Sequence, residues 1–316
     1  MSPAPRFSII LPTHNRADVL PWAIRSILAQ TITNFELFIV GDGCTDKTAD
    51  VVRSFSDPRI IWLDLPKAIG FGYANRNVAI RQARGEFIAH AAHDDLWFPD
   101  HLQLLGAQLT QPGMELVYSR PLWVIPRGMI APVNFDLADP TTLHAFIHQK
   151  QSAIPSACVA HRRDSLDKVG VFSETLKEQG DRDLWARIIN SSPQPNCACL
   201  PQPTCLHFRA HWRVHQDQVL KHEIIWEYLH TYENLPSSLR IPVADDQSEQ
   251  AAAWDIISGN LEDWPTRLRD AIAATDRAVK IDWLLSKTAR RRWTWPLVHT
   301  TRALFGRAHF EEIKKG

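Results

Sequence analysis

Short apolar runs alternate with helical hydrophobic patterns along the first third of the chain. The apolar runs predict strands at 7–11, 35–40, 60–63 and 87–91. The helical patterns lie between them, at 19–28, 47–55 and 70–84. Such strand–helix alternation predicts a mostly parallel sheet that is covered by helices on both faces. The polar loops that follow the strands should therefore gather at one edge of the sheet.

The fourth apolar run leads into two adjacent carboxylates, Asp94 and Asp95. Such a pair repels itself and loses hydration at the end of a buried strand, so it needs a cation or a hydrogen-bond network nearby. The carboxyl end of a strand in an open sheet is also where ligands bind. A hard divalent ion that shares its ligands with a phosphorylated substrate fits this placement. The alternative is two solvated acids, one of which caps the next helix.

Four motifs follow these strands in a fixed order. They are Ile-Leu-Pro-Thr-His-Asn-Arg at 10–16, Gly-Asp-Gly-Cys-Thr-Asp at 41–46, Ala-Asn-Arg-Asn at 74–77 and His-Asp-Asp-Leu-Trp-Phe-Pro at 93–99. In this order and spacing they resemble the family 2 inverting glycosyltransferases, over roughly residues 6–213. The resemblance implies the α/β GT-A fold, which is Rossmann-like. It also implies transfer of a sugar from a nucleotide-diphosphate donor, a UDP-sugar, to an acceptor hydroxyl with inversion.

The resemblance assigns residues to the nucleotide. Asp42 matches the acid that accepts a hydrogen bond from the base, which suits a carboxylate because it only accepts; shaping the turn is its alternative role. The loop beneath the nucleotide is matched by four residues, Pro12, Thr13, Asn15 and Arg16. Thr13 and Asn15 could equally cap the following helix. Arg76 is expected to pair with Asp42 or to reach the base or diphosphate, with a surface salt bridge as the alternative.

The acid motif departs from the family pattern, which often reads Asp-Ser-Asp-Asp. Here Ala92 replaces the first acid and His93 stands inside the motif. The resemblance places Asp94 on Mn²⁺ or Mg²⁺, has Asp95 orient the ion or cap the next helix, and puts His93 near the ribose or diphosphate. The stretch that ends at His211 resembles the Tyr-Arg-x-His that closes the family's core. His211 is therefore expected to contact the diphosphate or the metal.

The proton acceptor is expected at the start of a later helix. Residues 172–188 resemble the family's Glu-Asp-x-Asp-Leu-Trp-x-Arg. The resemblance places Asp181 on the catalytic base, which takes the proton of the acceptor hydroxyl, and Asp183 on a structural acid. Gly180 replaces the usual Glu. The alternative for Asp181 is a helix cap that the helix dipole favours.

Composition narrows the class of protein further. Lys+Arg and Asp+Glu are both 35, so charge gives no sign of a nucleic-acid partner. No apolar run is long enough to span a membrane, and no signal-peptide pattern opens the chain. The five cysteines show no metal-type spacing, so we expect reduced, mostly structural thiols in a cytoplasmic protein.

We expect a catalytic domain over 1–215, with a nucleotide-sugar part at 1–113 and an acceptor part at 114–215 that opens with a strand at 114–125. A helical extension should follow over 216–316. Its mixture of Arg and Trp suits either peripheral membrane contact or a homodimer. Two other functions stay open: a sugar-nucleotide-binding protein whose catalysis is impaired by Ala92 and Gly180, and a nucleotidyltransferase. The latter would need a Gly-rich phosphate loop with a lysine, which the N-terminal region lacks.

Overall fold

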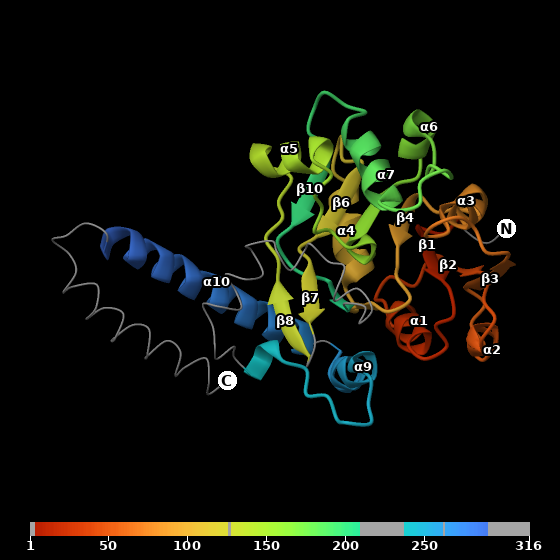
Figure 1. Ribbon diagram of the computed structural model, residues 1–316, viewed down its shortest axis with the longest axis horizontal. Coiled ribbons are helices and arrows are strands. Elements are labelled where there is room, and N and C mark those ends of the chain that lie inside the picture. The colour runs from red at the N-terminus through yellow and green to blue at the C-terminus, as the bar shows by residue number, and fades with distance from the viewer. Residues whose placement is uncertain (1–3, 126–127, 209–236, 262, 290–316) are drawn as a thin grey trace.

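A computed structural model describes residues 4–125, 128–208, 237–261 and 263–289. A large sheet flanked by helices forms its centre, and a smaller sheet lies beside it (Figure 1). The large sheet has the order β10-β6-β9-β4-β1-β2-β3. Its strands are β1 (Phe7–Thr13), β2 (Phe35–Asp42), β3 (Ile60–Leu65), β4 (Phe87–His90), β6 (Leu116–Ser119), β9 (Val159–Arg162) and β10 (Cys197–Leu200). Only β9 runs antiparallel to its neighbours, so the predicted mostly parallel sheet is confirmed.

The second sheet has the order β5-β11-β7-β8. Its strands are β5 (Leu96–Trp97), β7 (Leu122–Ile125), β8 (Met129–Pro132) and β11 (Cys205–Phe208). The single strand predicted at 114–125 is therefore wrong, because β6 and β7 belong to different sheets. The chain leaves the large sheet at Pro121, whose nitrogen has no hydrogen to donate to a strand ladder.

Helices cover both sheets. They are α1 (Leu20–Leu28), α2 (Thr48–Arg53), α3 (Tyr73–Gln82), α4 (His101–Leu109), α5 (Pro140–His148), α6 (Ser165–Val169), α7 (Gly180–Ile189), α9 (Glu249–Gly259) and α10 (Asp263–Ala289), with 3₁₀ turns at Ser156–Cys158 and Ser237–Leu239. In α1, Leu20, Ile24 and Ile27 share one face and are buried. All eight residues of β2 are buried, as expected for a parallel strand covered on both faces. The apolar residues of the large sheet and of the helices on it thus form one hydrophobic core.

The C-terminal helices pack on the smaller sheet. Leu268 and Ile272 of α10 join Leu96 and Phe98 in one apolar cluster. Two bidentate ion pairs add to this contact: Arg269 holds Asp100 ahead of α4 at 2.7 and 2.9 Å, and Arg120 holds Asp276 of α10 at 2.5 and 3.0 Å. Beyond this docked part, α10 projects away from the sheets (Figure 1).

Three further expectations concern the whole chain. The predicted boundary between residues 215 and 216 lies outside the described residues and stays a prediction. Among the described helices, none combines the length and the apolar run needed to cross a bilayer. All five cysteines are free thiols, as expected, although the Sγ atoms of Cys158 and Cys205 lie 3.2 Å apart.

Candidate active site

Four loops meet at one edge of the large sheet, because β1 to β4 are parallel and end on the same side. They follow β1 at residue 13, β2 at 42, β3 at 65 and β4 at 90. The first turn of α7 joins them through contacts with α3, the helix after β3. The residues predicted for nucleotide, metal and base therefore come from segments that the fold brings to a common edge.

Asp42 ends β2, as predicted, and its carboxylate is almost completely buried. Oδ1 accepts from the amide N–H of Ala68 at 2.8 Å and from Asn75 at 2.7 Å, and Oδ2 accepts from Lys67 Nζ at 2.5 Å. A carboxylate has about four acceptor positions. Asp42 therefore ties β2 to the loop after β3, and three of these positions receive hydrogen bonds from the described part of the chain.

The loop after β1 is fastened to the loop after β2. Asn15 adopts a left-handed backbone (φ 51°), and its Oδ1 accepts from the backbone N–H groups of Thr45 at 2.7 Å and Asp46 at 3.3 Å. The alternative that Thr13 or Asn15 caps the following helix is wrong, because the N-cap of α1 is Val19 and no side chain bonds there. Asn15 meets the neighbouring loop instead.

The other members of this loop have different partners. Pro12 accepts from His93 Nδ1 at 3.2 Å through its carbonyl, and the Thr13 hydroxyl is buried with no hydrogen-bond partner in the described part of the chain. The backbone N–H of Arg16 donates to Thr48 Oγ1 at 2.9 Å. All four predicted nucleotide-loop residues thus lie at the end of β1, where this loop contacts the acid motif through Pro12 and the segment after β2 through Asn15 and Arg16.

Asp94 and Asp95 have different surroundings. Asp94 is 19% exposed, and its Oδ2 lies 3.8 Å from His93 Nε2. Asp95 is buried, and its carboxylate accepts from His207 Nδ1 at 3.0 Å and from the N–H of Phe208 at 3.0 Å. Burial raises the pKa of the Asp95 carboxyl, and His207 opposes this rise.

The alternative that Asp95 caps the next helix is wrong. The N-cap of α4 is Asp100, which makes no side-chain cap bond, and the carboxylate of Asp95 is held by β11 of the second sheet. The structure therefore explains how two adjacent acids coexist: a hydrogen-bond network satisfies one of them, and partial exposure solvates the other.

Arg76 pairs with Asp181, the predicted base. Its Nη1 donates to Asp181 Oδ1 at 2.7 Å, and the arginine side chain is only 11% exposed. The predicted ion pair with Asp42 is wrong, because Asn75 and Lys67 occupy that carboxylate; successive helix residues point about 100° apart, so Asn75 and Arg76 reach different partners. The surface salt bridge is wrong too, since Arg76 is buried. A nucleotide contact by Arg76 stays a prediction.

Asp181 is bonded through only one of its two carboxylate oxygens in the described part of the chain. Its side chain is 30% exposed, and no hydrogen bond from the described part of the chain reaches Oδ2. Asp183, two residues on, bonds Arg187 at 3.0 Å, and Arg187 in turn holds the backbone carbonyls of Val169 and Val171. Asp183 therefore has the structural contact expected of it. The cap alternative for Asp181 gains no support, because Asp181 lies inside the first turn of α7 and the N-cap is Gln179.

The structure adds three residues to which the sequence assigned no role, two of them inside the motifs. His14 donates through Nδ1 to the carbonyl of Asp42 at 2.7 Å and is exposed at the sheet edge. Lys67 brings a cation to Asp42, and Asn75 fixes the same carboxylate while donating to Pro66 O at 2.8 Å. Lys67 could have been anticipated, since it follows a predicted strand at the ligand edge of the sheet.

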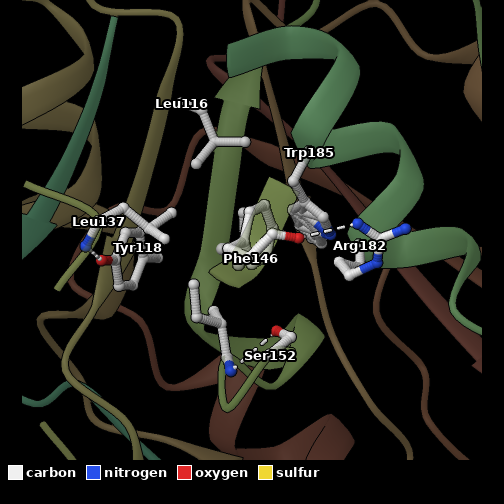
Figure 2. A pocket seen from close by; sticks show the side chains of 9 residues that line it. Leu116, Tyr118, Leu137, Phe146, Ser152, Arg182 and Trp185 are labelled. Atoms are coloured by element: carbon white, nitrogen blue, oxygen red, sulfur yellow. Dashed lines mark hydrogen bonds between the residues drawn. The ribbon is translucent and has the colours of Figure 1, made fainter. Parts of the chain in front are cut away.

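A small cavity lies behind α7, between β6 and α5 (Figure 2). Its walls are mostly apolar; Arg182 and Trp185 of α7 line it together with Phe146 of α5. Arg182 donates to the carbonyl of Phe146 at 2.9 Å, and the hydroxyl of Tyr118 bonds the backbone of Phe135 and Leu137 in the segment between β8 and α5. None of the predicted site residues lines this cavity. It is therefore separate from the edge of the sheet where those residues lie.

The metal prediction can be compared with the donor atoms present. Among the described residues no group of three His, Cys, Asp or Glu side chains is arranged to hold an ion. Asp94, with His93 at 3.8 Å, is the available pair. Mg²⁺ commonly takes one or two carboxylates and completes its shell with waters and substrate phosphates, so the carboxylate of Asp94 fits an ion that arrives with a nucleotide diphosphate. His211 lies outside the described residues.

Comparisons with known proteins agree with the fold. The structure of Staphylococcus aureus TarS residues 1–349 with UDP-GlcNAc superposes with a TM-score of 0.53, at 19% identity over 98% of this chain and 90% of that one. The mannosyltransferase PcManGT of Pyrobaculum calidifontis, solved with GDP-Man and Mn²⁺, gives 0.50 at 17% identity over 96% and 88%. At such identities the likeness concerns the fold alone. The fold is that of a GT-A glycosyltransferase.

Sequence relatives define the family. The profile of Glycosyl transferase family 2 matches residues 8–169, and the chain belongs to this family. An uncharacterized glycosyltransferase of Rickettsia typhi is 31% identical over 201 residues, 60% of each chain. The Escherichia coli enzyme WfgD, a UDP-Glc:alpha-D-GlcNAc-diphosphoundecaprenol beta-1,3-glucosyltransferase, is 35% identical over 111 residues, 35% of this chain and 44% of WfgD. The chain thus spans about 60% of the length of the first of these relatives and less of the second.

Proposed function

We propose that this protein is an inverting glycosyltransferase that moves a sugar from a UDP-sugar to an acceptor hydroxyl, with Asp181 as the base. One observation carries the proposal: a partly exposed carboxylate on the first turn of α7 is oriented through one oxygen by buried Arg76. The same helix that supplies Arg76 also supplies Asn75 to Asp42. Base and nucleotide acid are therefore fixed to one rigid element.

The proposed reaction is a single displacement. The acceptor oxygen attacks the anomeric carbon as Asp181 Oδ2 takes the hydroxyl proton. A carbon–oxygen bond forms on one face of the sugar, and the bond to the diphosphate breaks on the other, so the electron pair leaves with UDP. Asp42 and the 12–16 loop hold the nucleotide. Mn²⁺ or Mg²⁺, when bound beside Asp94, would neutralise charge on the diphosphate.

The acceptor class follows from the relatives only as a proposal. The name of WfgD states a lipid-diphosphate-linked sugar acceptor. By this analogy the acceptor here is a hydroxyl of a glycan or of a lipid-linked sugar. A panel of nucleotide sugars, tested for acceptor-dependent UDP release, examines donor and reaction together. Release from a UDP-sugar supports the proposal, whereas tight UDP binding without release from any donor favours the impaired sugar-nucleotide-binding protein that Ala92 and Gly180 suggest.

Asp42→Ala is expected to weaken UDP binding by roughly 1.5–3 kcal/mol, the worth of a hydrogen bond to a charged group. Isothermal titration with UDP measures this loss. Because Asp42 also bonds Ala68 and Asn75, its substitution could weaken UDP binding by disturbing the loop after β3. This effect must be separated from the loss of a contact with the uracil base. Asn75→Ala removes one of these loop bonds and keeps the carboxylate. Equal losses for both variants would leave Asp42 with only its structural role.

Metal should strengthen nucleotide binding through Asp94. UDP affinity is expected to rise about tenfold with Mn²⁺ or Mg²⁺ over EDTA, because an ion between a carboxylate and a diphosphate relieves their repulsion. Asp94→Ala should abolish this gain. Asp50→Ala, which removes an exposed acid of α2, should retain it. The same UDP affinity in EDTA and in metal would exclude an ion at Asp94.

A further inference from the structure

Buried polar side chains of α3 bond the start of α7 and the segment that leads to it. Tyr73, Asn75, Arg76 and Asn77 of α3 are all at most 9% exposed. Asn77 donates to the carbonyl of Phe172 at 2.9 Å and accepts from its N–H at 3.1 Å. Together with the hydrogen bond from Arg76 to Asp181, these bonds make α3 the element that holds the predicted base in position.

The start of α7 has no side-chain cap of its own. Its N-cap is Gln179, which adopts a left-handed backbone (φ 57°) unusual for a residue other than glycine. The first N–H groups of a helix need acceptors from elsewhere. Here the hydroxyl of Tyr73 accepts from the N–H of Gly180, the first residue of α7, at 2.9 Å. Tyr73 therefore caps a helix that is 107 residues away in the chain.

The ring of Tyr73 explains the departure at Gly180. A Cβ atom built on Gly180 would lie 2.6–2.7 Å from three ring carbons of Tyr73. No side chain fits at position 180 while this ring is in place, so the family's usual Glu is excluded. The ring also stacks on Phe172 at 5.4 Å, and the guanidinium of Arg76 lies over it at 5.0 Å. One aromatic side chain thus fixes both the backbone before Asp181 and the arginine that orients its carboxylate.

We propose that Tyr73 is a positioning residue for Asp181, whose hydroxyl anchors the start of α7 and whose ring replaces the side chain missing at Gly180. The proposal rests on the proposed function, because positioning matters for turnover only if Asp181 takes the proton. A base that is misplaced by a fraction of a bond length loses rate without losing nucleotide affinity.

Tyr73→Phe removes the hydroxyl and keeps the ring, and Tyr118→Phe is its matched control. The Tyr118 hydroxyl is also buried and bonds the N–H of Leu137 and the carbonyl of Phe135. We expect kcat for transfer to fall about tenfold in Tyr73→Phe and to stay within about twofold of wild type in Tyr118→Phe. KM for the donor should change in neither. Equal kcat values for the two variants would overturn the proposal.

Amide hydrogen exchange gives a readout that needs no turnover. A peptide covering 176–186 should exchange faster in Tyr73→Phe than in wild type or Tyr118→Phe, because the Gly180 N–H loses its acceptor. Unchanged exchange would overturn the cap. If Asp181→Asn transfers sugar at the wild-type rate, the proposed base fails; if Asp181→Asn is inactive and Tyr73→Phe is fully active, only the role of Tyr73 fails.

The packing of ring against glycine has its own test. Gly180→Ala should lower the melting temperature, because the ring of Tyr73 must move. In a Tyr73→Ala background the same change should cost much less, since the space is then open. Fully additive losses of melting temperature in the double variant would contradict the proposal that the Tyr73 ring occupies the space of a side chain at position 180.

Discussion

Asp181→Asn is expected to lower the rate of sugar transfer by roughly 10²–10⁴, the usual worth of general-base catalysis. The asparagine oxygen can still accept the hydrogen bond from Arg76, so the helix start should keep its geometry. The amide cannot usefully take up a proton at neutral pH. Acceptor-dependent UDP release measures the rate, and UDP titration should give an affinity close to that of wild type.

Asp183→Asn is the matched control, on the same helix and with the same loss of charge. Asp183 bonds Arg187, which holds the loop at Val169 and Val171. This variant should therefore lose stability, seen as a lower melting temperature, while the folded fraction keeps most of its transfer rate. A wild-type rate for Asp181→Asn, with transfer shown to limit turnover, would exclude Asp181 as the base.

The sequence was most informative where a residue follows its own strand. Asp42 and Asp94 could be placed at the ligand edge because apolar runs mark β2 and β4 and parallel strands end on one side. The helix start at Gly180 could be located by its motif. The placement of Asp42 and Asp94 depends on local pattern and on one rule of sheet topology, and that of Gly180 depends on a family motif, so none of them needed knowledge of distant contacts.

Partners far apart in the chain were harder to predict. Arg76 meets Asp181 across 105 residues, and Asp95 meets His207 across 112. Both side chains had nearer candidates with the right charge or geometry, and only the packing of α3 on α7 and of β5 on β11 decides between them. The split of the strand at 114–125 has a similar origin. The sequence shows Pro121, but it does not show that β6 pairs with β9 and β10 whereas β7 pairs with β8 and β11.

The second large effect that we expect is a fall in the free energy of unfolding in mild acid, caused by buried histidines. His101 and His161 are completely buried, and burial lowers the pKa of His101 to about 3 and that of His161 to about 4. His90 bonds His161, Nε2 to Nε2, at 3.1 Å, and burial lowers its pKa as well. In the unfolded chain each imidazole titrates near 6.5.

The sign follows from proton uptake. Between pH 6.5 and 4 the unfolded state binds protons that the folded state does not bind. The free energy of unfolding is therefore highest above pH 6.5, as far as these histidines determine it, and it falls as the pH decreases. At pH 5 the loss should be about 2 kcal/mol each for His101 and His161. The pKa of Glu36 is lowered from 4.5, so the loss of stability that it causes begins near pH 4.5, at the acid end of this range, whereas the raised pKa of Asp95 acts in the opposite direction.

Urea unfolding at pH 7.5, 6 and 5 tests this expectation, and a variant isolates the histidine contribution from that of Asp95. His161→Gln keeps a polar side chain of similar reach but does not titrate, so its unfolding free energy should fall by about 2 kcal/mol less than that of wild type between pH 7.5 and 5. His148→Gln, at an exposed position of α5, should follow the wild-type dependence. If His161→Gln and wild type show the same pH dependence, the buried pair does not stay neutral in the folded protein, and its hydrogen bond must be rebuilt around a charged ring.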